Sequence, residues 1–169
     1  MKRILPVALV ASLVAFFVMT DSQSWAETVA TKSKVCPTKN FPDLSKSVGA
    51  GDDYAKPTIT VTCSTTELKV SSNGMISFPF EQKTPNSLSI QTWSWSVPLN
   101  PAKAKTVSSI KNVMGTLGFT VSGLPIYGPT EGQQPAAEAF GDPVYNKILD
   151  TCGGHTGPGR EYHHHAITL

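Results

Sequence analysis

The residues best suited to chemistry are four histidines, and all of them lie in the last fifteen residues of the chain: His155, His163, His164 and His165. Alternate side chains of a β-strand project to the same side, so His163 and His165 are expected to share one face. Two imidazoles at this spacing can bind one metal ion. A chain reversal at Gly157-Pro158-Gly159 would bring His155 beside them. The spacing therefore predicts a metal site made of His155, His163 and His165.

Three neutral imidazoles suit a transition metal, and we expect zinc or copper. Five further residues are candidate ligands or neighbours of the ion: Cys152, Tyr162, His164, Glu161 and Asp150. Either carboxylate can fill a fourth position that is otherwise open to water. A Cys152 thiolate would favour the same two metals, although a disulfide is the stronger expectation for this thiol in an oxidising compartment.

Two other interpretations of the histidines remain open. They can form a structural hydrogen-bonded cluster, or a solvated tail that picks up metal adventitiously. The chain has no GxSxG elbow and no phosphate-binding loop, and no pair of carboxylates has a spacing that assigns acid and base roles. The sequence therefore leaves open whether the protein is an enzyme. If it is one, a metal-bound water is the expected nucleophile.

The N-terminus predicts export. Lys2 and Arg3 precede an apolar run over residues 4–19, and small residues typical of a cleavage site follow at 24–26. The apolar run is shorter than the roughly 20 residues that span a bilayer. We therefore expect residues 1–26 to be a cleaved signal peptide, no stable membrane span afterwards, and a secreted or periplasmic protein.

Cleavage would leave 143 residues, of which 12 are basic and 11 acidic, so the mature chain is nearly neutral. Nucleic acid is therefore not an expected partner, because its binding requires clustered Lys and Arg. Three cysteines remain: Cys36, Cys63 and Cys152. They allow three different bridges, of which Cys36–Cys63 is preferred, and one thiol is left over.

The pattern of apolar residues predicts a mainly β fold of short antiparallel strands and hairpins with Gly- and Pro-rich turns. An irregular lead-in over 27–56 precedes a domain over 57–169. An Asn-Gly pair between two alternating runs is a strong hairpin signal, so Asn73-Gly74 predicts a hairpin. Strands are expected at 58–63, at 68–70 and 76–80 on either side of this pair, at 91–97 and at 117–121.

One short helix is expected near 142–152. Asp142 can cap it, Pro143 suits the first helical position, and Gly153 is a typical stop. This helix would place Cys152 and His155 at one edge of the sheet.

Trp93 and Trp95 share one face of the expected strand over 91–97. Aromatic residues at this spacing are typical of the core face of a strand, and a carbohydrate platform is the alternative.

The segments GFTVSGLPIYGP (Gly118 to Pro129) and DTCGGHTGPGREYHHH (Asp150 to His165) resemble the YHYH domain family of secreted and periplasmic bacterial proteins. TVTCSTTELKVSSNGM and SVPLNP are similar to the start of that domain, so the resemblance covers residues 57–169. Within the motif, His164 stands in place of the second tyrosine. The resemblance implies a β-rich, extracytoplasmic domain that continues past Leu169, with a further cysteine available to Cys152. It implies no established activity.

Three functions follow from these observations. The first is a secreted YHYH-domain protein that binds a transition metal through its histidines. The second is a non-catalytic structural or adhesion-type envelope module, with a turn locked by hydrogen bonds of histidine and tyrosine. The third is a carbohydrate-binding module that uses Trp93 and Trp95.

Overall fold

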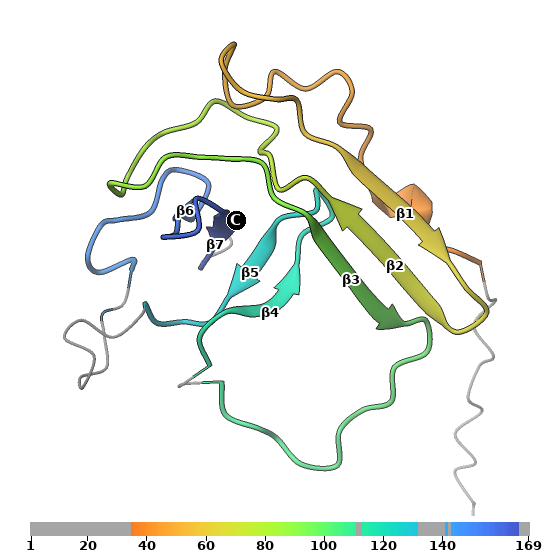
Figure 1. The fold of residues 1–169 in the computed structure, drawn as a ribbon. Helices are drawn as coiled ribbons and strands as arrows, with labels where there is room; N and C mark the ends of the chain where they lie inside the picture. Colours follow the sequence, from red (N-terminus) through yellow and green to blue (C-terminus); the bar gives the residue numbers. More distant parts are fainter. Residues whose placement is uncertain (1–34, 111–112, 132–140, 142, 166–169) are drawn as a thin grey trace, which may run out of the picture. The chain divides into compact units, whose positions relative to one another are not determined.

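The computed structural model describes residues 35–110, 113–131, 141 and 143–165, which form two β-sheets (Figure 1). The first sheet is antiparallel, in the order β1-β2-β3. The second has the order β4-β5-β7-β6, in which β5 and β7 run parallel and the other pairs are antiparallel. The strands are β1 (Ile59–Cys63), β2 (Glu67–Ser72), β3 (Trp93–Pro98), β4 (Thr116–Phe119), β5 (Pro125–Tyr127), β6 (Gly154–Thr156) and β7 (Tyr162–His164). The prediction of a mainly β fold is confirmed.

Alternation of apolar and polar residues explains the first sheet. Leu68, Val70 and Ser72 of β2 are buried, and the residues between them are exposed. The β1–β2 hairpin closes at Ser64, whose hydroxyl accepts hydrogen bonds from the amides of Thr66 and Glu67. Strands β1, β3 and β4 overlap the expected ranges 58–63, 91–97 and 117–121.

The expected hairpin at Asn73-Gly74 is wrong. Ser72 pairs with Trp93 of β3, and residues 75–80 form no strand. The side chain of Asn73 instead binds the chain just before β1: its Oδ1 accepts from the Thr58 amide at 2.9 Å, and its Nδ2 donates to the Lys56 carbonyl at 2.8 Å. Gly74 then takes a positive φ of 67° and directs the following apolar residues into the core.

The expected helix near 142–152 is also wrong, since the only helix among the described residues is one 3₁₀ turn, η1 (Thr38–Asn40). Residue 142 lies outside the described residues, and residues 143–147 form a turn. Lys147 has a φ of 57°, which interrupts a right-handed helix. Further on, the Asp150 carboxylate accepts the amides of Cys152 and Gly154. An aspartate that bonds nearby amides competes with the helical pattern.

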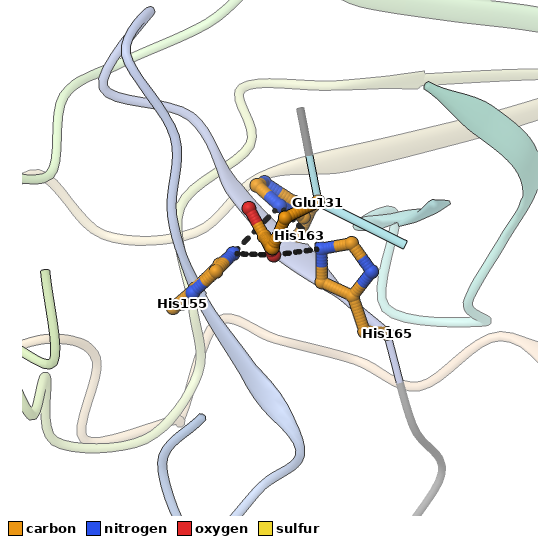
Figure 2. Close-up of side chains that lie close together, drawn as sticks. All are labelled: Glu131, His155, His163 and His165. Atoms are coloured by element: carbon orange, nitrogen blue, oxygen red, sulfur yellow. Dashed lines mark hydrogen bonds and ion pairs between the residues drawn. The ribbon is translucent and has the colours of Figure 1, made fainter. Parts of the chain in front are cut away.

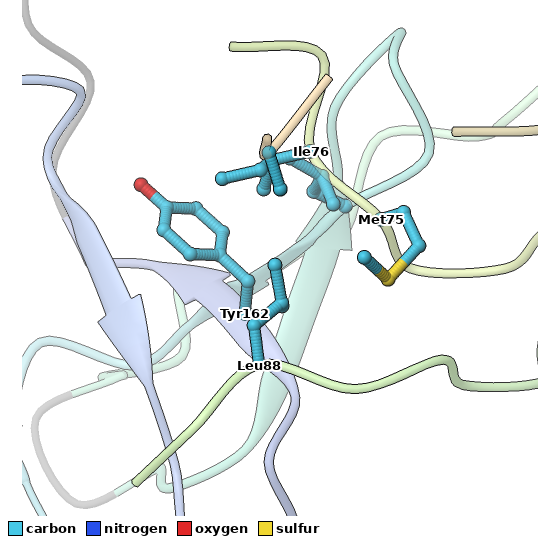
Figure 3. Close-up of a cluster of buried hydrophobic side chains, with 6 residues drawn as sticks. Met75, Ile76, Leu88 and Tyr162 are labelled. Carbon is cyan, nitrogen blue, oxygen red and sulfur yellow. The ribbon is translucent and has the colours of Figure 1, made fainter. Parts of the chain in front are cut away.

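The core joins residues from four parts of the chain. Its buried members are Ala50, Met75, Ile76, Leu88, Leu124 and Tyr162. Figure 3 shows the Tyr162 ring beside Ile76 and Leu88, with its hydroxyl pointing out of the cluster. Phe78 packs edge-on against the same ring, with centroids 5.7 Å apart. Ala50 comes from the irregular lead-in, whose described part therefore contributes to the core.

Trp93 and Trp95 are half-buried on one face of β3. Their rings stack with centroids 5.7 Å apart, and Trp95 stacks in turn on Phe119 of β4 at 5.0 Å. The ring faces within this stack are turned toward one another. The Trp95 ring stacks on both Trp93 and Phe119, which favours packing over a carbohydrate platform for this ring.

The expected bridge between Cys36 and Cys63 is confirmed, and Cys152 is a free thiol. The bridge ties the lead-in to the end of β1. The predicted signal peptide lies outside the described residues. Among the residues that the structure describes, no helix is long and apolar enough to cross a membrane.

Replacing Cys36 and Cys63 together by serine is expected to lower the free energy of unfolding by about 3 kcal/mol. The bridge closes a loop with a sequence separation of 27, and its loss increases the chain entropy of the unfolded state. Urea denaturation measures the change. Cys152→Ser is the matched control, because it removes a thiol without opening a bridge. Equal midpoints for wild type and the double variant would contradict the prediction.

Candidate metal centre

Strands β6 and β7 place the histidines. In their antiparallel register His155 lies directly opposite His163. The turn between the strands has a positive φ at Arg160. It is closed by two backbone hydrogen bonds: the Gly157 amide donates to the Glu161 carbonyl, and the Arg160 amide donates to the Gly157 carbonyl. His165 follows β7 on the same side as His163, and its amide donates to the Gly153 carbonyl at 3.0 Å. The chain reversal thus brings together the three histidines that the sequence predicts as ligands.

A fourth residue, Glu131, completes the cluster (Figure 2). The Nε2 atom of His163 lies 3.1 Å from Nε2 of His155 and 3.0 Å from Nε2 of His165. Oε1 of Glu131 lies 3.1 Å from Nε2 of His155 and 3.0 Å from Nε2 of His165. The potential ligand atoms of the four residues all lie within 4.8 Å of one another. This group can hold a metal ion.

For His155 and His165, the far side of the imidazole shows where the proton is. Nδ1 of His155 lies 3.0 Å from the Ile148 carbonyl, and Nδ1 of His165 lies 2.6 Å from the Gly128 carbonyl. A carbonyl only accepts, so both Nδ1 atoms must carry the proton. When these rings are neutral, their Nε2 lone pairs therefore face Glu131 and His163. A backbone carbonyl that fixes the tautomer in this way is the usual outer partner of a metal-bound histidine.

The three histidine side chains of the cluster are buried, and Glu131 is its most accessible residue. The side chains of His155, His163 and His165 are 2–4% exposed, whereas that of Glu131 is 29% exposed. Burial and the two neighbouring imidazoles lower the pKa of His163 to about 3, so it is neutral at physiological pH. Burial opposes ionisation of Glu131, but when the His155 and His165 imidazoles are protonated, their hydrogen bonds and positive charges hold its pKa well below the usual range.

Glu161, an expected ligand candidate, lies outside the group of four. Its Oε1 atom is 4.0 Å from Nδ1 of His163, on the side of the ring away from the cluster. The same oxygen accepts a long hydrogen bond of 3.4 Å from the Tyr127 hydroxyl, and the Tyr127 ring stacks on His163 with centroids 3.9 Å apart. Burial and the charge of Glu161 raise the pKa of Tyr127 to about 12, so its hydroxyl remains a donor.

The other candidates lie on the opposite face of β7. The Tyr162 hydroxyl donates to both oxygens of Asp150, at 2.9 and 2.8 Å, and this carboxylate also accepts the amides of Cys152 and Gly154. Nδ1 of His164 lies 3.0 Å from the Cys152 carbonyl. Gly154 has no room for a side chain, because a Cβ there would lie 2.4 Å from the Tyr162 hydroxyl. These residues build the turn that carries His155.

Glu131 was missed by sequence reasoning. It lies 24 residues before His155, next to a segment with no periodic pattern, and nothing in its neighbours distinguishes it. In the structure its amide donates to the Gly141 carbonyl at 3.2 Å, which holds it beside the histidines.

The cluster opens into a cleft of about 450 Å³, a volume within the range of small-molecule sites. Polar groups of Tyr127, Thr130 and Asn146 line it together with apolar groups of Met114 and Ile148. The two carboxylates of Glu131 and Glu161 also face it. No Lys or Arg is among the described residues that line this cleft.

A mainly β fold with a buried group of three histidines and one carboxylate defines this protein as a candidate metal-binding β protein. Residues 94–168 match a family model described as YHYH protein, so this part of the chain carries a YHYH domain. The match confirms the family resemblance, over a shorter range than the expected 57–169. Comparisons with curated proteins and with solved structures found no match.

Proposed function

We propose that this protein is an exported metal-binding protein in which His155, His163, His165 and Glu131 hold one transition-metal ion, zinc or copper. The proposal rests on one observation: three hydrogen-bond acceptors, two imidazole nitrogens and one carboxylate, lie close together. Nε2 of His155 and Nε2 of His165 have their protons fixed on the far nitrogen, yet both lie within 3.1 Å of the Glu131 carboxylate. Only added protons or a cation relieve this repulsion, and a metal ion satisfies all four groups at once.

The spacing of the atoms supports the same conclusion. Bonds of about 2.0–2.1 Å to a tetrahedral zinc ion place neighbouring ligand atoms about 3.3 Å apart. The four contacts around the ring of ligand atoms are 3.0–3.1 Å long. The remaining pairs, His155 with His165 and His163 with Glu131, are bounded only by the 4.8 Å limit of the group. A tetrahedral shell therefore also requires the ligand atoms across the ring to approach each other. Imidazole and carboxylate ligands suit copper as well.

Export is the second part of the proposal. A basic start, an apolar run and small residues at 24–26 together have the order of a secretory signal. The Cys36–Cys63 disulfide is consistent with an oxidising compartment, where such bridges persist. Both features support a secreted or periplasmic location.

A structural envelope module remains the second candidate. It is favoured by the Tyr162–Asp150 pair, which is buried and uses the motif tyrosine to lock the turn before β6. In that case the histidines would only extend a hydrogen-bonded network, and no ion would be needed.

Metal analysis separates the two candidates. Protein processed and purified from its host is expected to contain about one zinc or copper ion per chain, as one four-ligand site requires. Addition of a strong chelator should lower the melting temperature by several degrees, since an ion that binds only the folded state stabilises it. Elemental analysis and thermal melting measure both effects. Metal-free protein whose melting temperature ignores the chelator would favour the structural module.

A further inference from the structure

The carboxylate of Glu161 has unused hydrogen-bonding capacity inside the cleft. An ionised carboxylate accepts about four hydrogen bonds. Among the described residues, Glu161 receives one donor, the Tyr127 hydroxyl at 3.4 Å from Oε1, and Oε2 has none although it is buried. The side chain is only 12% exposed. A buried carboxylate with few donors is costly. Because Oε2 is buried, a ligand in the cleft can reach the carboxylate only at Oε1, whose single donor is distant, and the site favours a ligand that supplies an N–H group there.

The turn between β6 and β7 shapes this position. A Cβ at Gly157 would lie 2.3 Å from Oε1 of Glu161, and one at Gly159 would lie 2.7 Å from Oε2. The two glycines therefore leave room for the carboxylate against the backbone of the turn. In this place Glu161 lies on the same cleft as the metal cluster without belonging to it.

The charges of the cleft select the kind of ligand. Glu131 and Glu161 contribute two carboxylates, and no Lys or Arg of the described lining opposes them. An ion bound by the cluster would occupy Glu131 and leave Glu161 as the free negative group. With an ion bound, the cleft would have a Lewis acid, the ion, at one end and a hydrogen-bond acceptor, Glu161, at the other. Met114 and Ile148 form an apolar wall of the cleft.

We propose that this cleft binds small amino amides, such as an amino-acid amide or the N-terminal end of a peptide. Glu161 pairs with the ammonium group, the amide oxygen enters as a fifth ligand of the ion held by the cluster, and the apolar wall accepts an aliphatic side chain. The oxygen contact rests on the metal-binding function proposed above. The ammonium contact does not, because Glu161 lies outside the group of ligands.

Calorimetric titration with two matched probes tests this proposal at neutral pH. Leucinamide carries the ammonium group, and 4-methylpentanamide has the same skeleton without it. Leucinamide is expected to bind zinc-loaded protein at least about tenfold more tightly, because a charge-assisted hydrogen bond contributes about 1.5 kcal/mol or more. In Glu161→Gln the two probes should bind within about twofold of each other. Glu81→Gln is the control, since this exposed carboxylate lies away from the cleft and should keep the full preference.

Titration of metal-free protein distinguishes this proposal from the metal-binding function. A preference for leucinamide that survives without metal, in protein that never loads an ion, would retain the ammonium site and remove the metal site. Equal or absent binding of both probes to protein with one ion per chain would overturn the amino-amide site and leave the metal site intact. Wild-type protein answers both questions, so the result does not depend on whether Glu161→Gln folds.

Discussion

Replacing His163 and His165 together by alanine is expected to abolish metal binding, with a rise in Kd of at least about 100-fold. The change removes two of the four ligands, and loss of an outer partner alone typically costs 10–100-fold in metal affinity. His155 and Glu131 remain, but two ligands cannot form the shell that a tetrahedral ion requires. Competition with a chelating dye measures the affinity, and elemental analysis measures the content.

The neighbouring residue supplies a matched control. His164→Ala also removes an imidazole from this end of the chain, but His164 lies on the opposite face and contacts the Cys152 carbonyl. Its metal content should equal that of wild type. Unchanged metal affinity in the double variant, or an equal loss in His164→Ala, would show that the cluster is not the binding site.

Replacing Asp150 by alanine is expected to lower the free energy of unfolding by about 5 kcal/mol. Asp150 is 8% exposed, and its carboxylate accepts from three donors: the Tyr162 hydroxyl, which lies within 2.9 Å of both oxygens, and the amides of Cys152 and Gly154. Its removal leaves two buried donors, the Tyr162 hydroxyl and the Gly154 amide, and the half-buried Cys152 amide without this acceptor. Each buried donor left unpaired costs about 1–3 kcal/mol. Denaturant unfolding followed by tryptophan fluorescence measures the change.

Asp43→Ala is the matched control, because it removes an aspartate with a similar local hydrogen bond from an exposed position. Asp43 also accepts the amide two residues ahead, from Ser45 at 3.0 Å, but it is exposed. Water replaces the lost acceptor there, so the unfolding midpoint should barely move. Similar midpoints for the two variants would contradict the assignment of Asp150 as the hub of the turn.

The positions of β1, β3 and β4 follow from local patterns. Alternation of Ile59, Val61 and Cys63, or of Trp93, Trp95 and Val97, is the direct consequence of a two-residue period, and no distant contact is needed to recognise it. The same reasoning failed at Asn73-Gly74. The Asn73 side chain forms hydrogen bonds with the backbone of Lys56 and Thr58, and the local pattern of apolar residues does not predict these distant contacts. The expected helix failed for a similar reason, since Asp150 serves Tyr162, twelve residues later, and the adjoining turn.

The spacing of the histidines by itself determined that His163 and His165 share one side, because strand geometry fixes the direction of alternate side chains. It also indicated a turn that returns His155 to them, since Gly and Pro favour a reversal. Only the tertiary structure decided the rest of the site. Glu131 reaches the cluster through backbone pairing with Gly141, and Glu161 stands beside it because two glycines leave room for its carboxylate. Such contacts depend on how distant segments pack, and the periodic pattern of residues along the sequence does not predict them.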